Sequence, residues 1–394
     1  MTPNAPSSEL LDDCGLNARM ADFLTSPPAV GTVILAGGKA LRMGGGDKGR
    51  QAVGGQDILT RLVAVLRPQA GAMALSANGD PHRFADLGLP VLTDGLEDAG
   101  PLAGLLAGMA WARAQGFPWL LTAPTDTPFL PADLLIRLGF GVGAGQSAAI
   151  AASGGRRHPV VGLWSTELLV PLQRFVVEQG QRKMSLWAEH CGAAVVEWPD
   201  EPFDPFFNIN HPAEREQAEA LGEQRPCRVG AVVLPEGRGG QAMLADFAAA
   251  AEACGLAVGG LLQQGSKSKG DAPEDITLVA LDGCERFSIM QTLARSGACT
   301  VNPQAVAEAS AVLRRAVAER RLPILINKFG SMEVQGEGLA DEMMAVMAEG
   351  LPLLITVSLK RLDAWLNFCG GFCELLPPDP AALRAWWERN RPAG

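Results

Sequence analysis

The feature that most constrains the fold of this sequence is a glycine-rich segment directly after a short apolar run. The run Thr32–Leu35 has the length of a buried strand, and residues 36–48 then read AGGKALRMGGGDK, with five glycines. Glycine lets backbone N–H groups approach a ligand because no Cβ stands in the way. In open α/β sheets, such loops lie at the carboxyl ends of central strands. The segment therefore predicts a strand, a ligand-binding loop and an α/β sheet.

Short apolar runs alternate with longer stretches of helical period in both halves of the chain, which is typical of a mainly parallel α/β sheet. In the first half, strands are expected at Ala72–Ser76, Val91–Leu92 and Trp119–Thr122, and helices at Asp57–Arg67 and Pro101–Gln115. In the second half, strands are expected at Val229–Leu234, Ile276–Leu281, Pro323–Ile326 and Leu353–Val357, and helices at Pro303–Glu319 and Ala340–Ala348.

A polar stretch, Glu214–Pro226, separates the two halves. We therefore expect a polar leader of little independent structure at residues 1–29, an α/β domain at 30–222 and a second α/β domain at 227–394.

The composition limits the classes of partner. A net charge of -10 gives no basis for binding nucleic acid or an anionic membrane surface, so any phosphate must be held by a local site. No apolar stretch is long enough to span a membrane and the first residues do not resemble a signal peptide, which indicates a cytoplasmic protein. The eight cysteines are scattered, and only Cys369 and Cys373 are close, which favours reduced, buried thiols over a zinc site.

Two cations in the glycine-rich segment, Arg42 and Lys48, have the charge needed to neutralise a triphosphate. The segment is neither a Walker A loop nor the G-x-G-x-x-G turn of dinucleotide folds. From spacing alone, a flexible loop with solvated cations remains the alternative.

The pattern L-A-G-G-x3-R-M-G-x2-D-K resembles the signature loop of the molybdenum cofactor guanylyltransferases, a branch of the nucleotidyltransferases. Further matching segments are Ser76-Ala77-Asn78, Asp94, Gly100-Pro101-Leu102-Ala103-Gly104, Pro124-Thr125-Asp126-Thr127-Pro128, Arg157-His158-Pro159 and Asn208-Ile209-Asn210. The resemblance implies a Rossmann-like nucleotidyltransferase domain that uses Mg²⁺ to transfer GMP from GTP to molybdenum-molybdopterin, releasing pyrophosphate. Guanine is implied by the Leu-Ala-Gly-Gly form, since the cytidylyl relatives more often read Ala-Ala-Gly.

Two carboxylates follow expected strands. Asp126 comes just after Trp119–Thr122, where a hard oxygen ligand suits Mg²⁺, although a turn-forming residue is an equal alternative. Asp94 could equally be a helix cap or turn residue. The resemblance makes Asp126 the metal ligand and gives Asp94 a nucleotide contact. It implies catalytic roles for Arg42, Lys48 and Asp126, and nucleotide contacts at Leu35, Ala36, Gly37, Lys48, Asn78, Asp94 and Asp126. The chain has Ser76 where some family members have asparagine, which leaves a nucleotide contact there open.

The acceptor is a pterin phosphate, so its site needs cations and hydrogen-bonding groups. Candidates are Arg157, His158, Arg182, Lys183, Asn208 and Asn210, with Arg156 in the same loop as Arg157. Solvated charges and a plain turn are the alternatives for these residues.

The second domain resembles a domain of unknown function that accompanies molybdenum-related proteins. Val229–Leu234 leads into PEGRGGQA, a P-loop layout without the lysine and Ser/Thr that hold phosphate and Mg²⁺. Asn327 and Lys328 stand where a Walker B segment has its acidic pair. We therefore expect a degenerate P-loop-like domain without nucleotide hydrolysis, serving substrate handover, regulation or contact with a biosynthetic protein or recipient oxidoreductase.

Two other functions remain open from the sequence. One keeps the fold and changes the substrate, as in a cytidylyltransferase or a sugar-phosphate nucleotidyltransferase. The other is a non-catalytic carrier or scaffold for the finished cofactor.

Overall fold

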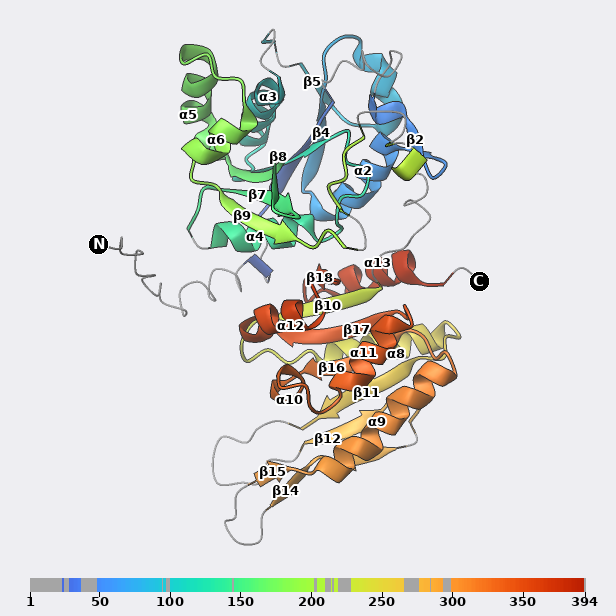
Figure 1. Ribbon diagram of the computed structural model, residues 1–394. Helices are drawn as coiled ribbons and strands as arrows, with labels where there is room; N and C mark the ends of the chain where they lie inside the picture. Colours follow the sequence, from blue (N-terminus) through green and yellow to red (C-terminus); the bar gives the residue numbers. More distant parts are fainter. Residues whose placement is uncertain are drawn as a thin grey trace, which may run out of the picture. The chain divides into compact units, whose positions relative to one another are not determined.

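The structure, a computed structural model, describes residues 23–24, 28–36, 48–93, 95–96, 100–143, 145–201, 204–209, 214, 216–218, 228–265, 276–283, 285–292 and 299–392. The chain divides into two compact units, Met1–Gln224 and Arg225–Gly394, which we call the first and second unit. Each is an α/β unit built on a seven-stranded sheet (Figure 1).

The first sheet is mainly parallel, as expected. Its strand order is β5-β4-β1-β6-β8-β7-β9, and only the pairs that involve β8 are antiparallel. The strands are β1 (Val30–Leu35), β4 (Ala72–Ser76), β5 (Val91–Leu92), β6 (Trp119–Pro124), β7 (Ala148–Ser153), β8 (Arg156–Ser165) and β9 (Ala194–Trp198). A small hairpin, β2 (Ala52–Val53) and β3 (Gln56–Asp57), follows the glycine-rich segment.

Helices cover both faces of this sheet. The core of one face contains buried residues of α2 (Ile58–Leu66) and α4 (Leu134–Gly143). The core of the other contains residues of α3 (Pro101–Ala114), α5 (Leu169–Gln173) and α6 (Met184–His190). Glycines let α3 approach closely, since a Cβ on Gly108 would lie 2.9 Å from Val33 Cγ2. Of the expected leader, Phe23 is described and packs on α4 at Gly139.

The direction of β8 decides which residues meet at the ligand-binding edge. Because β8 runs opposite to its neighbours, its first residues lie at the edge where β1, β4, β6, β7 and β9 end. A register irregularity against β7 falls between Ile150 and Ala151, opposite Gly162 and His158. Bulges of this kind re-aim side chains.

The second sheet has the order β13-β12-β11-β16-β17-β10-β18. The pairs β11–β12 and β12–β13 are antiparallel, and the other pairs are parallel. Its strands are β10 (Val229–Leu234), β11 (Gly259–Gln264), β12 (Thr277–Ala280), β13 (Arg286–Ser288), β16 (Ile324–Phe329), β17 (Leu353–Ser358) and β18 (Glu374–Leu376). A separate pair, β14 (Met290–Thr292) and β15 (Cys299–Val301), is antiparallel.

The helices of the second unit also lie on both sides of the sheet. Residues of α8 (Gln241–Ala253) and α13 (Pro380–Asn390) share one core with β10. Helix α9 (Pro303–Ala318) packs on β11, and α11 (Ala340–Ala348) packs on α9. Two shorter helices, α10 (Ser331–Val334) and α12 (Leu362–Phe368), complete the unit.

The two closely spaced cysteines are both buried. Trp365 Nε1 donates to Cys373 Sγ at 3.3 Å, and Cys369 is 3% exposed. Among the described residues, no group of His, Cys, Asp and Glu is arranged to hold a metal through three or more such side chains. In the same part of the chain, no helix is both long and apolar enough to cross a membrane.

Candidate functional site

Asp126 lies in the turn that follows β6, at the edge where the parallel strands end. Its side chain is half-buried, and its backbone carbonyl accepts a hydrogen bond from Ile209 N at 2.9 Å. This bond brings the Asn208 segment, 82 residues later in the sequence, next to the Asp126 turn. The flanking Thr127 hydroxyl donates to the Pro124 carbonyl at 3.4 Å, so it supports the turn.

The end of the glycine-rich segment is packed against the same turn. A Cβ on Gly49 would lie 2.6 Å from Leu59 Cγ and 3.3 Å from Thr125 Cγ2. A side chain at this position would force Leu59 to move, and the close contact places the backbone of Lys48 next to Thr125, which adjoins Asp126. The predicted contacts Gly37, Arg42, Asp94 and Asn210 lie outside the described residues, as does the side chain of Lys48.

A backbone hydrogen bond links the residue that follows β1 to the last residue of β4. Ala36 N donates to the Ser76 carbonyl at 2.8 Å, which fixes the start of the glycine-rich segment beside β4. The Ser76 side chain is buried against α3, where a Cβ on Gly104 would lie 2.8 Å from Ser76 Oγ. Ser76 therefore packs on α3, whereas Asn78, two residues later, is exposed at the edge.

Asn208 carries a buried polar atom without a hydrogen-bond partner in the described part of the structure. That atom is the side-chain oxygen Oδ1. A buried amide oxygen without a partner is costly, since burial removes its water and nothing replaces it. Its neighbour Ile209 donates a backbone hydrogen bond to Asp126, so this oxygen belongs to the residue next to one that contacts the candidate metal ligand.

His158 is held by a hydrogen-bonded chain of three side chains. Ser153 Oγ donates to Asp204 Oδ1 at 2.7 Å and lies 2.8 Å from His158 Nε2. A serine hydroxyl has one proton, so Ser153 must accept from His158, and the histidine carries its proton on Nε2. The ring also packs on Phe206, with the ring centroids 5.0 Å apart.

Burial lowers the pKa of His158 below its ordinary value of 6.5. Arg156 lowers this pKa further, whereas Asp204 and Glu197 raise it and only partly offset the burial. These are the charged groups that influence the ring among the described residues. At neutral pH, His158 is therefore a hydrogen-bonding group and not a cation.

The free energy of unfolding is expected to depend on pH through His158. The folded state binds a proton at His158 less well than the unfolded chain does. The contribution of His158 to the free energy of unfolding is therefore complete above pH 6.5 and is lost as the pH falls through the lowered pKa. Between pH 7.5 and 5.5, the free energy of unfolding should fall less in His158→Gln than in the wild type. The difference should be under about 1 kcal/mol, because the His158 side chain is half-exposed. Urea unfolding at several pH values measures it. A slope in His158→Gln equal to that of the wild type would contradict the assignment.

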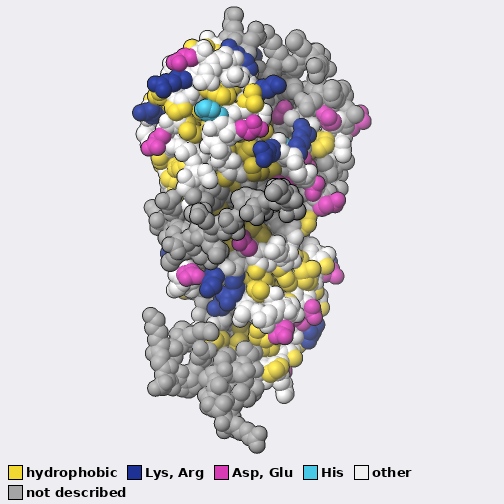
Figure 2. All heavy atoms as spheres, turned by 60° about the vertical axis from the view of Figure 1, so that its left-hand side comes forward, with side chains coloured by type: hydrophobic (Ala, Val, Ile, Leu, Met, Phe, Trp, Pro, Cys, Tyr) yellow, Lys and Arg dark blue, Asp and Glu magenta, His cyan; other side chains and the backbone are white. Residues whose placement is uncertain are grey.

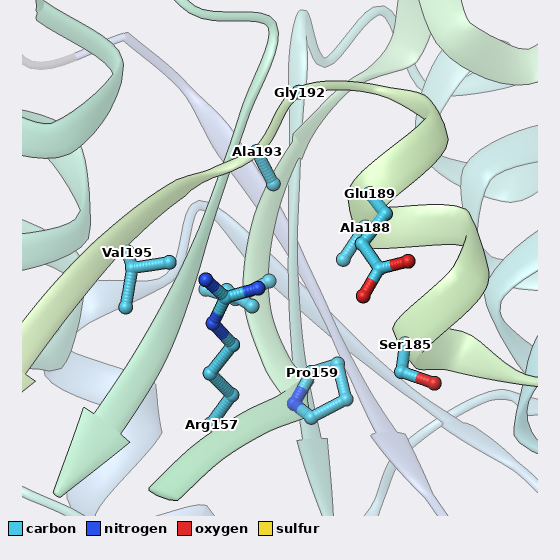
Figure 3. Close-up of a pocket in the computed structure, with 9 residues that line it drawn as sticks. Arg157, Pro159, Ser185, Ala188, Glu189, Gly192, Ala193 and Val195 are labelled. Atoms are coloured by element: carbon cyan, nitrogen blue, oxygen red, sulfur yellow. The ribbon is translucent and has the colours of Figure 1, made fainter. Parts of the chain in front are cut away.

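Arg157 and His158 lie on opposite faces of the sheet, as neighbouring residues of a strand do. Arg157 lines a cavity of about 90 Å³ between β7, β8 and α6, together with Ile150, Pro159, Ser185, Ala188, Glu189, Gly192, Ala193 and Val195. Figure 3 shows its guanidinium between Val195 and Ala188, beneath Ala193. Arg157 has no ion-pair partner within the described residues.

The other two candidate cations lie in the loop before α6. Arg182 donates to the carbonyls of Val176 at 2.7 Å and Gln181 at 3.0 Å, so it also stabilises its own loop. Lys183 is exposed directly before the helix. A Cβ on Gly100 would lie 3.8 Å from the Arg182 carbonyl oxygen, which places this loop beside the start of α3.

Known proteins match the two units separately. A profile for the "MobA-like NTP transferase domain" matches residues 32–194, and one for a protein of unknown function (DUF2478) matches residues 229–386. A molybdenum cofactor guanylyltransferase of Rhodopseudomonas palustris (strain BisB5) is 47% identical over 199 residues, which cover 94% of that protein and 49% of this chain. The chain belongs to the molybdenum cofactor guanylyltransferase family.

Further relatives extend the comparison. The molybdenum cofactor guanylyltransferase of Acidiphilium cryptum (strain JF-5) is 47% identical over 189 residues, 93% of its length and 48% of this chain. Among solved structures, the molybdopterin-guanine dinucleotide biosynthesis protein A of Archaeoglobus fulgidus has 24% identity and a TM-score of 0.39, covering 98% of that chain and 49% of this one. The family match confirms the resemblance inferred from the glycine-rich segment, and it is confined to the first unit.

For a guanylyltransferase, a divalent cation is the expected cofactor, and the residues present fit one. Asp126 supplies a carboxylate and Asn208 a buried amide oxygen without a partner, and hard oxygen atoms are the ligands that Mg²⁺ prefers. Burial raises the pKa of the half-buried Cys191 to about 12, so this thiol stays protonated at neutral pH.

Sequence reasoning missed three residues of this region: Arg50, Ser153 and Asp204. Asp204 lies four residues before Asn208, outside the matching segment Asn208-Ile209-Asn210. Ser153 ends an alanine-rich strand, and its role depends on contacts 5 and 51 residues away along the chain. No local pattern predicts such contacts.

Proposed function

We propose that the chain transfers GMP from GTP to molybdenum-molybdopterin, forming the guanine dinucleotide cofactor and pyrophosphate. The observation that carries this proposal is the 47% identity to a guanylyltransferase over 94% of that protein's length. The site geometry supports it, because the end of the glycine-rich segment, Asp126 and Asn208 lie at one edge of the sheet. On this proposal, the chemistry belongs to residues 30–222.

Two anions must be brought together in this reaction, so catalysis is mainly charge neutralisation and alignment. Mg²⁺ supplies positive charge at the triphosphate when it is bound. Asp126 and Asn208 are the residues proposed to hold it. The Ile209–Asp126 hydrogen bond supports this role, because it links the segments that carry both side chains.

The nucleotide would lie along the glycine-rich segment. Leu35, Ala36 and Gly37 are proposed to contact it through their backbone, and Arg42 and Lys48 to neutralise the triphosphate. Asn78 and Asp94 follow neighbouring strands and are proposed as further nucleotide contacts. The Ala36–Ser76 backbone bond supports this arrangement, since it fixes the start of the segment beside the strand that leads to Asn78.

The acceptor phosphate would be neutralised by Arg157, Arg182 and Lys183. The cavity beside Arg157, about 90 Å³, has the volume of roughly three water molecules and suits a phosphate-sized group better than a pterin ring. Because His158 is neutral, we assign it a hydrogen bond to the acceptor, as we do Asn210 and the side-chain NH2 group of Asn208, whose Oδ1 is the atom proposed to hold the metal. Figure 2 shows basic and acidic side chains interspersed on one face, which agrees with local binding groups.

The second unit is proposed to be a degenerate P-loop-like domain without nucleotide hydrolysis. The parallel strands are ordered β11-β16-β17-β10-β18, so β17 lies between β10, which precedes the glycine loop, and β16, which carries Asn327. Thr356 Oγ1 donates to Asn327 Oδ1 at 2.6 Å, which engages the amide at the position of the missing carboxylate. Substrate handover, regulation and contact with a biosynthetic protein or recipient oxidoreductase in the cytoplasm are the roles proposed for this unit.

Turnover tests the proposal. Purified chain with GTP, Mg²⁺ and molybdenum-loaded molybdopterin should release pyrophosphate and form the dinucleotide, and EDTA should stop both. Product formation that persists in EDTA would contradict the metal assignment.

A further inference from the structure

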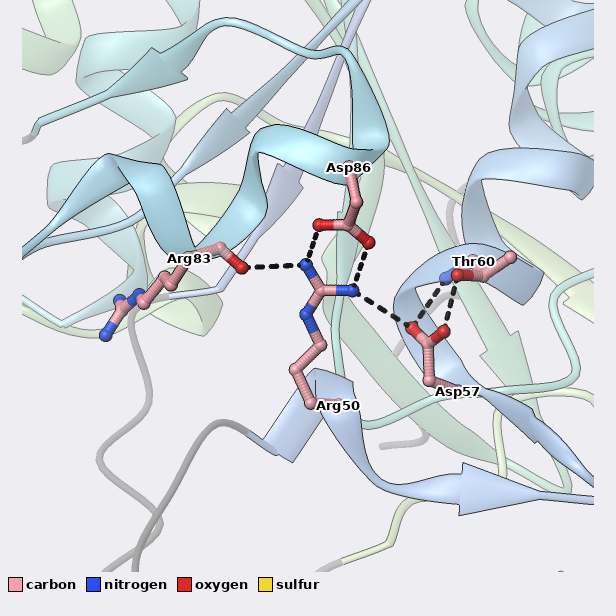
Figure 4. Close-up of polar contacts among 5 residues, drawn as sticks. All are labelled: Arg50, Asp57, Thr60, Arg83 and Asp86. Carbon is pink, nitrogen blue, oxygen red and sulfur yellow. Dashed lines mark hydrogen bonds and ion pairs between the residues drawn. The ribbon is translucent and has the colours of Figure 1, made fainter.

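Arg50, two residues after the glycine-rich segment, has a guanidinium group that contacts Asp86, Arg83 and Asp57. Its guanidinium forms a two-point ion pair with Asp86, in which NH1 donates to Oδ2 at 2.8 Å and NH2 to Oδ1 (Figure 4). NH2 also donates to the Arg83 carbonyl at 2.8 Å, and NH1 lies 3.9 Å from Asp57 Oδ1. Asp57 caps α2 by accepting from Thr60 N at 3.0 Å.

The partner element is η3, a 3₁₀ helix at Pro81–Leu87, and it also contacts Asn78, one of the proposed nucleotide contacts. Arg83 NH2 donates to the Asn78 carbonyl at 2.6 Å. Both arginines pack on the buried ring of Phe84, at 5.5 Å for Arg50 and 4.7 Å for Arg83. Therefore η3 connects the end of the glycine-rich segment to the residue that follows β4.

The opposite side of the same short stretch is fixed by packing. Gly49 packs closely on Leu59 and Thr125, because a Cβ at this position would lie 2.6 Å from Leu59 Cγ and 3.3 Å from Thr125 Cγ2. Lys48 thus precedes two residues that are each held, Gly49 against the Asp126 turn and Arg50 against η3. A cation two residues before such an anchor has little freedom in its backbone position.

We propose that Arg50 is a positioning residue for the nucleotide: through Asp86 and η3 it fixes the distance between Lys48 and Asn78. This inference rests on the proposed function, because it assigns both residues to GTP. Arg50 does not touch the nucleotide in this account. Its effect should therefore appear in the affinity for GTP.

The strength of the contact limits the size of the effect. The Arg50 and Asp86 side chains are 28% and 61% exposed, and an exposed ion pair contributes little to stability by itself. Two parallel hydrogen bonds and a carbonyl acceptor define an orientation, however, which a single charge does not. The Arg50 hydrogen bond also lowers the pKa of Asp86, so the pair stays ionised at neutral pH.

The test compares Arg50→Ala, Arg50→Lys and the exchange Arg50→Asp/Asp86→Arg by steady-state kinetics. Arg50→Ala should raise KM for GTP about 3- to 10-fold with kcat changed less than about twofold. Arg50→Lys keeps the charge without the two-point geometry, so its KM for GTP should lie between the values of the wild type and Arg50→Ala. The exchange should recover part of the loss. Arg321→Ala removes a comparable pair with Glu319, 2.9 Å long, in the second unit and should change neither constant.

Urea unfolding of each variant separates positioning from misfolding. A raised KM with an unchanged unfolding midpoint supports the proposal. A KM equal to that of the wild type in Arg50→Ala, or a loss of rate that follows the loss of folded protein, overturns it. If the wild type itself neither binds nor turns over GTP, the proposed function fails and not this inference alone.

Discussion

Replacing Asp126 by asparagine is expected to lower the rate of guanylyl transfer by about three orders of magnitude or more. Asparagine keeps the shape of the side chain and removes the charge that holds a divalent cation. The fold should tolerate the change, because the turn is held by its backbone, through Ile209 N and the Asp126 carbonyl. Pyrophosphate release at saturating GTP, measured over a range of Mg²⁺ concentrations, gives the loss and shows how far excess metal restores the rate.

The matched control is Glu167→Gln. Glu167 is exposed and follows the end of β8, at the opposite edge of the sheet from the site. This variant makes the same change from carboxylate to amide and should keep full activity. An Asp126→Asn protein that folds normally and retains more than about a tenth of the wild-type rate would contradict the metal-binding role.

Gly260→Ala is expected to unfold the second unit, because it should lower the free energy of unfolding of this unit by at least about 4 kcal/mol. Gly260 has φ 132°, and a Cβ there would lie 1.9 Å from the Leu325 carbonyl oxygen. That oxygen belongs to the backbone of β16, the neighbouring parallel strand, so no side chain can move away to make room. Hydrogen exchange of residues 229–386, measured beside that of the first unit, reports the loss.

The same variant tests the division of labour between the units. If transfer is confined to residues 30–222, pyrophosphate release should stay within about threefold of the wild type when the second unit is unfolded. Gly255→Ala is the control, because Gly255 has φ 84° but open space around it, and it should cost about 1 kcal/mol. Loss of transfer together with loss of the second unit would contradict the division.

The sequence predicted those elements whose pattern is local. Runs such as Thr32–Leu35 and Val229–Leu234 are apolar throughout because both faces of a central parallel strand are covered, and they form β1 and β10. The sequence did not predict β7, because AAIAAS, at residues 148–153, is as compatible with a helix as with a strand. The reversed direction of β8 is likewise set by its neighbours in the sheet.

The candidate site follows the same division. The position of the glycine-rich segment and of Asp126 at strand ends was predictable, since both follow apolar runs. The sequence did not reveal that Arg157 and His158 lie on opposite faces, that burial keeps His158 neutral, or that Arg50 is bonded to η3. Each of these depends on groups brought together from distant segments by the tertiary fold.

The most direct test of guanylyl transfer is a turnover measurement with labelled GTP or labelled CTP, Mg²⁺ and molybdenum-loaded molybdopterin, following pyrophosphate and the dinucleotide product. We expect stoichiometric pyrophosphate and product with GTP and almost none with CTP. Turnover with CTP instead would keep the chemistry and contradict the guanine assignment. Absence of turnover with either nucleotide, from protein shown to be folded, would contradict catalysis and favour a cofactor carrier.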